Sequence, residues 1–145
     1  MDIGKLHVVI VHFPIALALS ALLTDIIWII TRKESFRIAG MYCLVLAAIA
    51  VIPTAFTGDE LLDSIQAGLS GDYLSMAHTH RALAVTSLTL IILAAIVRIY
   101  RQNNLQKGWL GIYYVLIVLV GAFISATGHY GGMLSFGKDY LSGLF

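Results

Sequence analysis

The sequence contains few charged residues and almost no cysteine. Asp, Glu, Lys and Arg make up 12% of its 145 residues, whereas a soluble domain has about 25%. The formal net charge of +1 gives no support for a nucleic-acid-binding protein, because that function needs a clustered basic surface. The single cysteine, Cys43, lies in an apolar run, so the sequence excludes a disulfide framework and a thiolate metal site.

Sequence signatures of common catalytic sites are also missing. There is no nucleophile elbow, no phosphate-binding glycine loop and no pair of catalytic carboxylates. The sequence therefore gives little support for a hydrolytic or transfer enzyme.

Apolar residues, by contrast, are abundant and lie in four long runs. Hydrophobic residues account for 59% of the chain, and the mean hydropathy is +0.90. A protein this small cannot bury so many apolar side chains in a water-soluble core, so lipid must cover the excess. The runs cover roughly residues 6–30, 36–56, 73–99 and 108–127, and each approaches or exceeds the ~20 residues that a membrane-spanning helix needs.

These runs predict the fold class. They are continuous and do not alternate with polar residues, which indicates helices and not the strands of a membrane barrel. We predict an all-α fold: an integral membrane four-helix bundle, up-down-up-down, forming a single transmembrane domain over residues 1–145.

Two segments outside the runs have an interfacial character. Between the second and third spans, Leu61, Leu62, Ile65 and Leu69 recur at helical spacing among acidic residues, which predicts a short interfacial helix. Residues 129–145 mix glycines with aromatics, which is typical of a second interfacial segment.

Basic residues are more numerous at one end of the predicted bundle than at the other. Six lie near the end formed by the two short loops, and three near the end that carries both termini: Arg32, Lys33, Arg37, Arg98, Arg101 and Lys107 against Lys5, Arg81 and Lys138. Because cytoplasmic loops carry the excess of Lys and Arg, we expect both termini outside the cytoplasm.

All five histidines are expected at that extracytoplasmic end. They begin the first span (His7 and His12), begin the third (His78 and His80) and end the fourth (His129). A histidine at such a depth is costly unless it faces the bundle interior and finds a partner. A single such histidine more often makes a hydrogen bond to a neighbour than binds a metal. The hypothesis of a metal or haem site therefore rests on the five histidines taken together.

The depths of the histidines favour one pair. His12 and His80 lie about six and seven residues inside their helices, so both are ~9–10 Å from the helix start. Two neutral imidazoles at equal depth are suited to bind a haem iron from both sides, and bundle interiors hold such cofactors. We therefore predict His12 and His80 as the axial ligands of haem b, with His129 or His7 as a substitute or as part of a second site.

Helical geometry and ligand chemistry restrict the other choices. His7 and His12 are ~140° apart around a helix, and His78 and His80 ~200°, so only one of each pair faces a given iron; we choose His80. Zinc is disfavoured because the close ligand spacing of a structural site is missing. A copper ion on three histidines, or no cofactor at all, remains an alternative.

Three further residues have two interpretations each. Arg81 follows His80 and either pairs with a haem propionate or anchors the interface, where it extends toward water or pairs with Asp59 or Asp72. Pro14 removes a backbone donor, and a kink there would turn His12 inward. Asp25 is the one acid within a span, and pairing with Arg98 or capping a neighbouring helix is favoured over a role as proton relay.

Several motifs resemble those of a known family. They are Leu6-His7, Val11-His12-Phe13-Pro14-Ile15-Ala16-Leu17, Thr57-Gly58-Asp59, His80-Arg81, Gly128-His129-Tyr130-Gly131-Gly132-Met133-Leu134 and Gly137-Lys138-Asp139-Tyr140-Leu141. Together they resemble a family of bacterial membrane proteins, domain of unknown function 2231, along the whole chain.

The resemblance implies a four-helix module of the bacterial inner membrane. Relatives belong to respiratory gene neighbourhoods and are sometimes joined to c-type cytochrome domains, which favours haem and electron transfer. By this match His7, His12, His80 and His129 are histidines of the family pattern, and His78 is not.

Three functions remain as hypotheses. The first is a b-type haem protein that carries electrons at the extracytoplasmic face, as a subunit of a respiratory or photosynthetic complex, with a quinol or a periplasmic cytochrome as partner. Under this hypothesis the protein is expected to be an electron-transfer subunit and not a stand-alone enzyme. The second is a cofactor-free accessory subunit of a membrane complex. A transporter or channel is a weaker third, because the spans are expected to lack paired charges, discontinuous helices and internal repeats.

Overall fold

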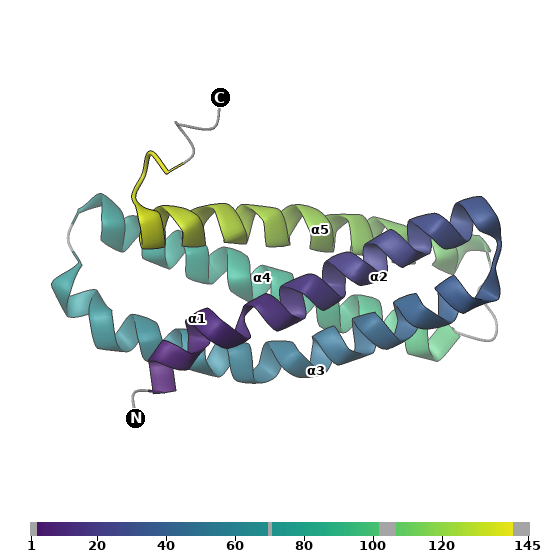
Figure 1. Ribbon diagram of the computed structural model, residues 1–145, viewed down its shortest axis with the longest axis horizontal. Helices are drawn as coiled ribbons and strands as arrows, with labels where there is room; N and C mark the ends of the chain where they lie inside the picture. Colours follow the sequence, from purple (N-terminus) through teal and green to yellow (C-terminus); the bar gives the residue numbers. More distant parts are fainter. Residues whose placement is uncertain (1–2, 70, 102–106, 141–145) are drawn as a thin grey trace.

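The computed structural model describes residues 3–69, 71–101 and 107–140. Its elements, in chain order, are the short 3₁₀ helix η1 (Ile3–Leu6), α1 (His7–Ile10), α2 (His12–Thr31), α3 (Glu34–Ile65), the 3₁₀ turn η2 (Gln66–Gly68), α4 (Asp72–Arg101) and α5 (Lys107–Phe136). The described residues contain no strand. The helices run up and down along one long axis (Figure 1).

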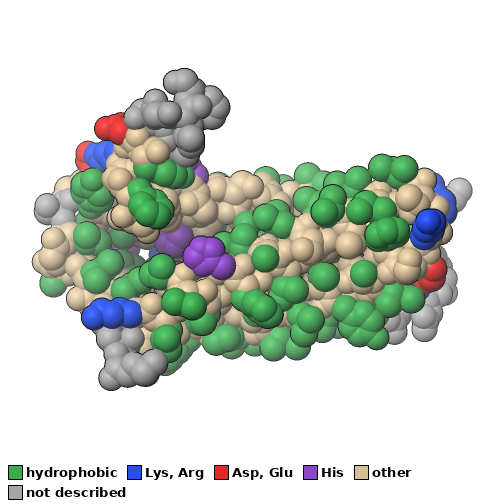
Figure 2. All heavy atoms as spheres, in the orientation of Figure 1, with side chains coloured by type: hydrophobic (Ala, Val, Ile, Leu, Met, Phe, Trp, Pro, Cys, Tyr) green, Lys and Arg blue, Asp and Glu red, His purple; other side chains and the backbone are tan. Residues whose placement is uncertain are grey.

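Four segments are long and apolar enough to cross a membrane. They are Ile3–Thr31, Glu34–Gly68, Asp72–Tyr100 and Trp109–Phe136. Figure 2 shows hydrophobic side chains over the length of the bundle, with basic and acidic side chains at its two ends. Large apolar residues such as Val9, Ile30 and Val115 are exposed on this surface, where lipid replaces water. The predicted all-α four-helix membrane bundle is confirmed.

Two helices extend further than predicted. The separate interfacial helix expected between the second and third spans does not exist, because its residues up to Ile65 are the last turns of α3. Helix α5 continues to Phe136 and so includes residues 129–136 of the expected interfacial segment; residues 141–145 of that segment lie outside the described part of the chain. The helices pass without a break from the apolar region into the polar boundary.

Proline acts differently in the two helices that contain it. Near Pro14 the first span is divided at Val11 into α1 and α2, so the predicted local break is present. Pro53 lies inside the continuous helix α3. There the Thr57 hydroxyl donates to the Pro53 carbonyl, one turn earlier in the helix, over 2.9 Å.

The core is formed by small and medium apolar side chains from all four long helices. Ala18 and Ala21 of α2 pack with Leu44 and Ala47 of α3, and with buried residues of α4 and α5: Ile91, Ala94, Ala95, Tyr113, Ile117, Val120 and Ile124. Small residues allow membrane helices to approach closely. Helix α2 packs along α3 and α4 along α5, and the two hairpins join mainly through α3 and α4.

The two helical hairpins resemble each other at a shift of 73 residue numbers. Helix α3 begins at Glu34 and α5 at Lys107. Many buried positions of the first hairpin correspond to buried positions of the second: 14 with 87, 18 with 91, 21 with 94, 25 with 98, 40 with 113, 44 with 117, 47 with 120 and 51 with 124. The correspondence is partial, because the hairpins pack more closely through α3 and α4 than through α2 and α5.

Candidate functional site

Two histidines occupy equivalent positions in the two hairpins and make equivalent hydrogen bonds. His7 Nδ1 lies 3.0 Å from the Thr54 carbonyl oxygen, and His80 Nδ1 lies 2.9 Å from the Thr127 carbonyl oxygen. Position 7 corresponds to 80, and 54 to 127, by the same shift of 73. Each imidazole is half-buried and reaches from the first helix of its hairpin to the second.

A glycine lies beneath each imidazole. A Cβ atom added to Gly58 would be 2.9 Å from His7 Cε1, and one added to Gly131 would be 3.1 Å from His80 Cε1. These contacts are too close for ordinary side chains. The two glycines, again at equivalent positions, therefore let each ring lie against the backbone of the neighbouring helix.

The hydrogen bonds fix the tautomer of both rings. A backbone carbonyl accepts only, so the proton lies on Nδ1, and in a neutral ring the lone pair lies on Nε2. Neither His7 nor His80 uses Nε2 in a hydrogen bond with a described residue. An imidazole held by Nδ1–H on a carbonyl, with Nε2 available, is the usual arrangement of a metal-binding histidine.

The two rings belong to different hairpins and lie beside an ion pair that joins these hairpins. Arg81, the residue after His80, pairs with Asp59, the residue after the glycine beneath His7. Figure 2 shows histidine side chains around a hollowed part of the surface near the end that carries the termini. The structure therefore combines His7 and His80 into one candidate site between the hairpins.

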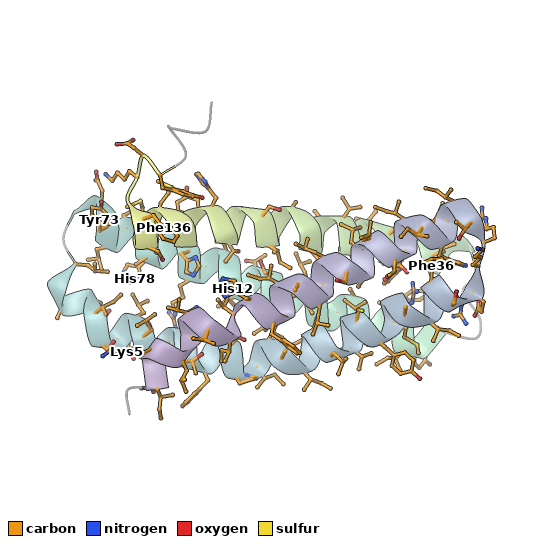
Figure 3. The ribbon with its side chains drawn as sticks, viewed as in Figure 1. Lys5, His12, Phe36, Tyr73, His78 and Phe136 are labelled. Carbon is orange, nitrogen blue, oxygen red and sulfur yellow. The ribbon has the colours of Figure 1, made fainter. Side chains whose placement is uncertain are left out.

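The other histidines are exposed. His12 lies on the outer side of α2. His7 is the half-buried histidine of the first span, and its hydrogen bond matches that of His80. The break at Val11 did not turn His12 inward. As expected from their angle, only one of His78 and His80 is half-buried, and it is His80. Figure 3 shows Lys5, His12 and His78 at the same end of the bundle, far from Phe36.

His129 has an aromatic environment. Its Nδ1 lies 3.4 Å from the Tyr140 hydroxyl, and its ring centroid is 5.9 Å from those of both Tyr130 and Tyr140. Its side chain is exposed. These contacts tie the end of α5 to the residues that follow it.

The arginine next to the candidate site pairs with an acid of the other hairpin. Arg81 Nε donates to Asp59 Oδ1 over 2.7 Å, with both side chains about half exposed. Arg81 follows His80 and Asp59 follows Gly58, so this pair joins the hairpins beside the two imidazoles. The predicted pairing of Arg81 with Asp59 is therefore present.

The donor set restricts the metals that fit. Among residues 3–69, 71–101 and 107–140, no group of three or more His, Cys, Asp or Glu side chains could hold a metal ion. Two imidazoles are too few for a copper or zinc ion bound by protein ligands alone. They suit a metal that brings its own equatorial ligands, and haem iron is such a metal.

A second polar cluster lies inside the bundle at the opposite end. Arg98 Nη2 donates to Asp25 Oδ1 over 2.8 Å and to the Arg37 carbonyl over 2.9 Å, and the Tyr113 hydroxyl donates to Asp25 Oδ2. Asp25 is 1% exposed and Arg98 is 0% exposed. The predicted pairing of Asp25 with Arg98 is confirmed, while the contributions of Tyr113 and the Arg37 carbonyl were missed.

Comparison with known families identifies the chain. Residues 5–140 match the model of a family described as "Predicted membrane protein (DUF2231)". The protein belongs to the DUF2231 family. No curated protein and no solved structure matches it. The resemblance inferred from the histidine and glycine motifs is therefore confirmed, and these motifs include both histidines and both glycines of the candidate site.

One expectation about this DUF2231 protein is wrong. The spans contain a buried charge pair, Asp25 with Arg98, which they were expected to lack. Arg98 Nε has no hydrogen-bond partner among the described residues.

Proposed function

We propose that this DUF2231 protein binds haem b between its two hairpins, with His7 and His80 as axial ligands. The observation that carries the proposal is the pair of equivalent imidazoles, each held by Nδ1 and each with Nε2 unused. His7, first considered as a substitute ligand, thus replaces His12. Haem ligated in this way exchanges one electron, at a potential that the axial ligands and their hydrogen bonds set.

The hydrogen bonds of the site orient the two imidazole rings and make their Nε2 atoms more basic. Nδ1–H bonds to the Thr54 and Thr127 carbonyls restrict rotation of the rings and make Nε2 a stronger donor. Gly58 and Gly131 provide the space for the rings. Arg81 is engaged with Asp59, so we assign it to joining the hairpins.

We further propose that the site faces the extracytoplasmic side of a bacterial inner membrane. The excess of Lys and Arg near the opposite end supports this orientation. The histidines lie at one end, so electrons would enter and leave there, or pass to other membrane subunits of a respiratory or photosynthetic complex. A quinol or a periplasmic cytochrome is the proposed partner. Fusing alkaline phosphatase to the C-terminus tests the orientation: an active enzyme supports it, and an inactive enzyme contradicts it.

Absorption spectra test the haem proposal. The protein, purified in detergent after expression with added haem precursor, is measured oxidised and dithionite-reduced, with haem counted per chain. We expect a sharp reduced α-band in the wild type and in the matched controls His12→Ala and His78→Ala. His7→Ala and His80→Ala should each abolish that band.

Other spectra lead to different conclusions. A colourless wild-type protein would contradict haem binding and favour the accessory-subunit function. Loss of the band in His12→Ala but not in His7→Ala would restore the pair predicted from the sequence.

A further inference from the structure

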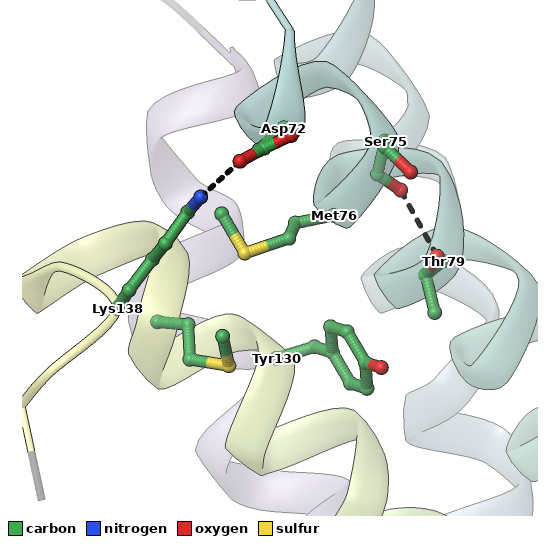
Figure 4. A pocket seen from close by; sticks show the side chains of 7 residues that line it. Asp72, Ser75, Met76, Thr79, Tyr130 and Lys138 are labelled. Carbon is green, nitrogen blue, oxygen red and sulfur yellow. Dashed lines mark hydrogen bonds and ion pairs between the residues drawn. The ribbon is translucent and has the colours of Figure 1, made fainter.

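A cavity that is wide open to the surface lies over α4 and α5 at the histidine end, on residues that the proposed haem site does not use. Its volume is about 350 Å³. The first two turns of α4, the end of α5 and one residue beyond it line the cavity: Asp72, Ser75, Met76, Thr79, Tyr130, Met133 and Lys138 (Figure 4).

The outer end of the cavity is charged. Lys138 Nζ donates to the Asp72 carboxylate, and this contact is drawn in Figure 4. The carboxylate raises the pKa of Lys138 above its usual value, so the ammonium group stays charged at neutral pH. Residues 72 to 79 rise ~10 Å along the helix, so the cavity extends from this charged boundary into the apolar part of the bundle.

The walls of the cavity combine thioethers with hydroxyl groups that donate no hydrogen bond to another side chain of the described residues. The Ser75 and Tyr130 hydroxyls make no hydrogen bond to a described residue, and Thr79 donates only to the Ser75 carbonyl, over 2.9 Å. Met76 and Met133 supply the apolar surface. Methionine sulfur makes favourable contacts with flat rings, and hydroxyls are donors for carbonyl oxygens.

We propose that this cavity binds the head group of a membrane quinone. A quinone is a neutral flat ring with carbonyl acceptors at its edges and an apolar tail. The ring suits the thioethers, the carbonyls suit the hydroxyls, and the tail can remain in lipid. A charged lipid head group is a poorer fit, because the only ammonium group of the lining is already paired with Asp72.

The position of the cavity relates this inference to the proposed function. Thr79 immediately precedes His80, and Tyr130 precedes Gly131, which contacts the His80 ring. A quinone here would lie behind one proposed haem ligand as its redox partner. The role of the quinone as redox partner rests on the proposed function, whereas quinone binding itself requires no haem.

Photolabelling tests the site in the full chain in detergent, both with and without haem. The probe is a short-chain quinone carrying an azido group, and labelled peptides are located by mass spectrometry. Label should map to residues 72–79 and 130–138, and unlabelled quinone should displace it. Ser75→Phe fills the cavity from its exposed edge and should reduce labelling at least about tenfold. Ser64→Phe is the matched control at an exposed position of α3 and should label like the wild type.

Three results would overturn the inference. Label could map elsewhere, Ser75→Phe could label like the wild type, or phospholipid could displace the probe as well as quinone does. A colourless protein that labels at these residues would contradict only the haem proposal, and a haem protein that does not label would contradict only the quinone site.

Discussion

Asp25 and Arg98 occupy equivalent positions of the two hairpins, yet they carry opposite charges and bind each other. Their Nη2–Oδ1 distance is 2.8 Å, and both side chains are buried. A symmetric pair of identical hairpins would place like charges at these positions. The opposite charges therefore join the two halves in one specific arrangement, at the end far from the histidines.

The ion pair makes a charge exchange informative. Asp25→Arg or Arg98→Asp alone places two like charges side by side in the core, and each should cost at least as much stability as removing one partner of a buried pair, about 3–5 kcal/mol. The double variant restores opposite charges at the two positions and should recover part of that loss. Recovery should be incomplete, because the Tyr113 hydroxyl is positioned to donate to a carboxylate at position 25, and the Arg37 carbonyl to accept from a guanidinium at position 98. Unfolding in detergent measures all three variants, and a double variant no better than the worse single would contradict the equivalence of the positions.

The Tyr113 hydroxyl should contribute to the same cluster. Tyr113→Phe removes a hydrogen bond to a buried carboxylate, which should lower stability by about 1.5–3 kcal/mol. Tyr114→Phe is the matched control, since Tyr114 is the adjacent, less buried tyrosine. Equal stability of the two variants would show that the Tyr113 hydroxyl contributes nothing to the cluster.

The glycines under the histidines should control haem binding. Gly58→Ala or Gly131→Ala places a methyl group 2.9 or 3.1 Å from an imidazole Cε1, so the ring must move. We expect a lower haem content per chain and a weaker reduced α-band for both variants, to a similar extent because the positions are equivalent. Gly111→Ala meets no atom within 4 Å and should retain the wild-type spectrum. Full haem content in both site variants would show that the rings need no such space.

Arg81 offers a test of its assigned role. Because it is half exposed and paired with Asp59, Arg81→Gln should change stability by less than about 1 kcal/mol. Haem content should stay at the wild-type level, and the small stability change should shrink at high salt. If Arg81→Gln instead lost haem while Asp59→Asn kept it, Arg81 would hold a propionate.

The positions of the helices were more predictable than their inward faces. In a soluble bundle, apolar residues mark the face that turns inward. Here lipid makes the outer face apolar as well, so hydrophobic periodicity does not distinguish His7 from His12. The polar Asp25 was an exception: a carboxylate inside a span needs a partner, and Arg98 was the cation at the matching depth.

The sequence by itself determined that this chain crosses a membrane four times, that its histidines gather at one end, and that Asp25 needs a polar partner inside the bundle. These properties follow from the cost of exposing polar groups to hydrocarbon, which depends on composition and depth alone. Only the tertiary structure decided that His7 and His80 form the equivalent pair, that Tyr113 joins the buried charges, and that α3 continues to Ile65. Those features depend on how far each helix is rotated and where it ends, and packing between the two hairpins sets both.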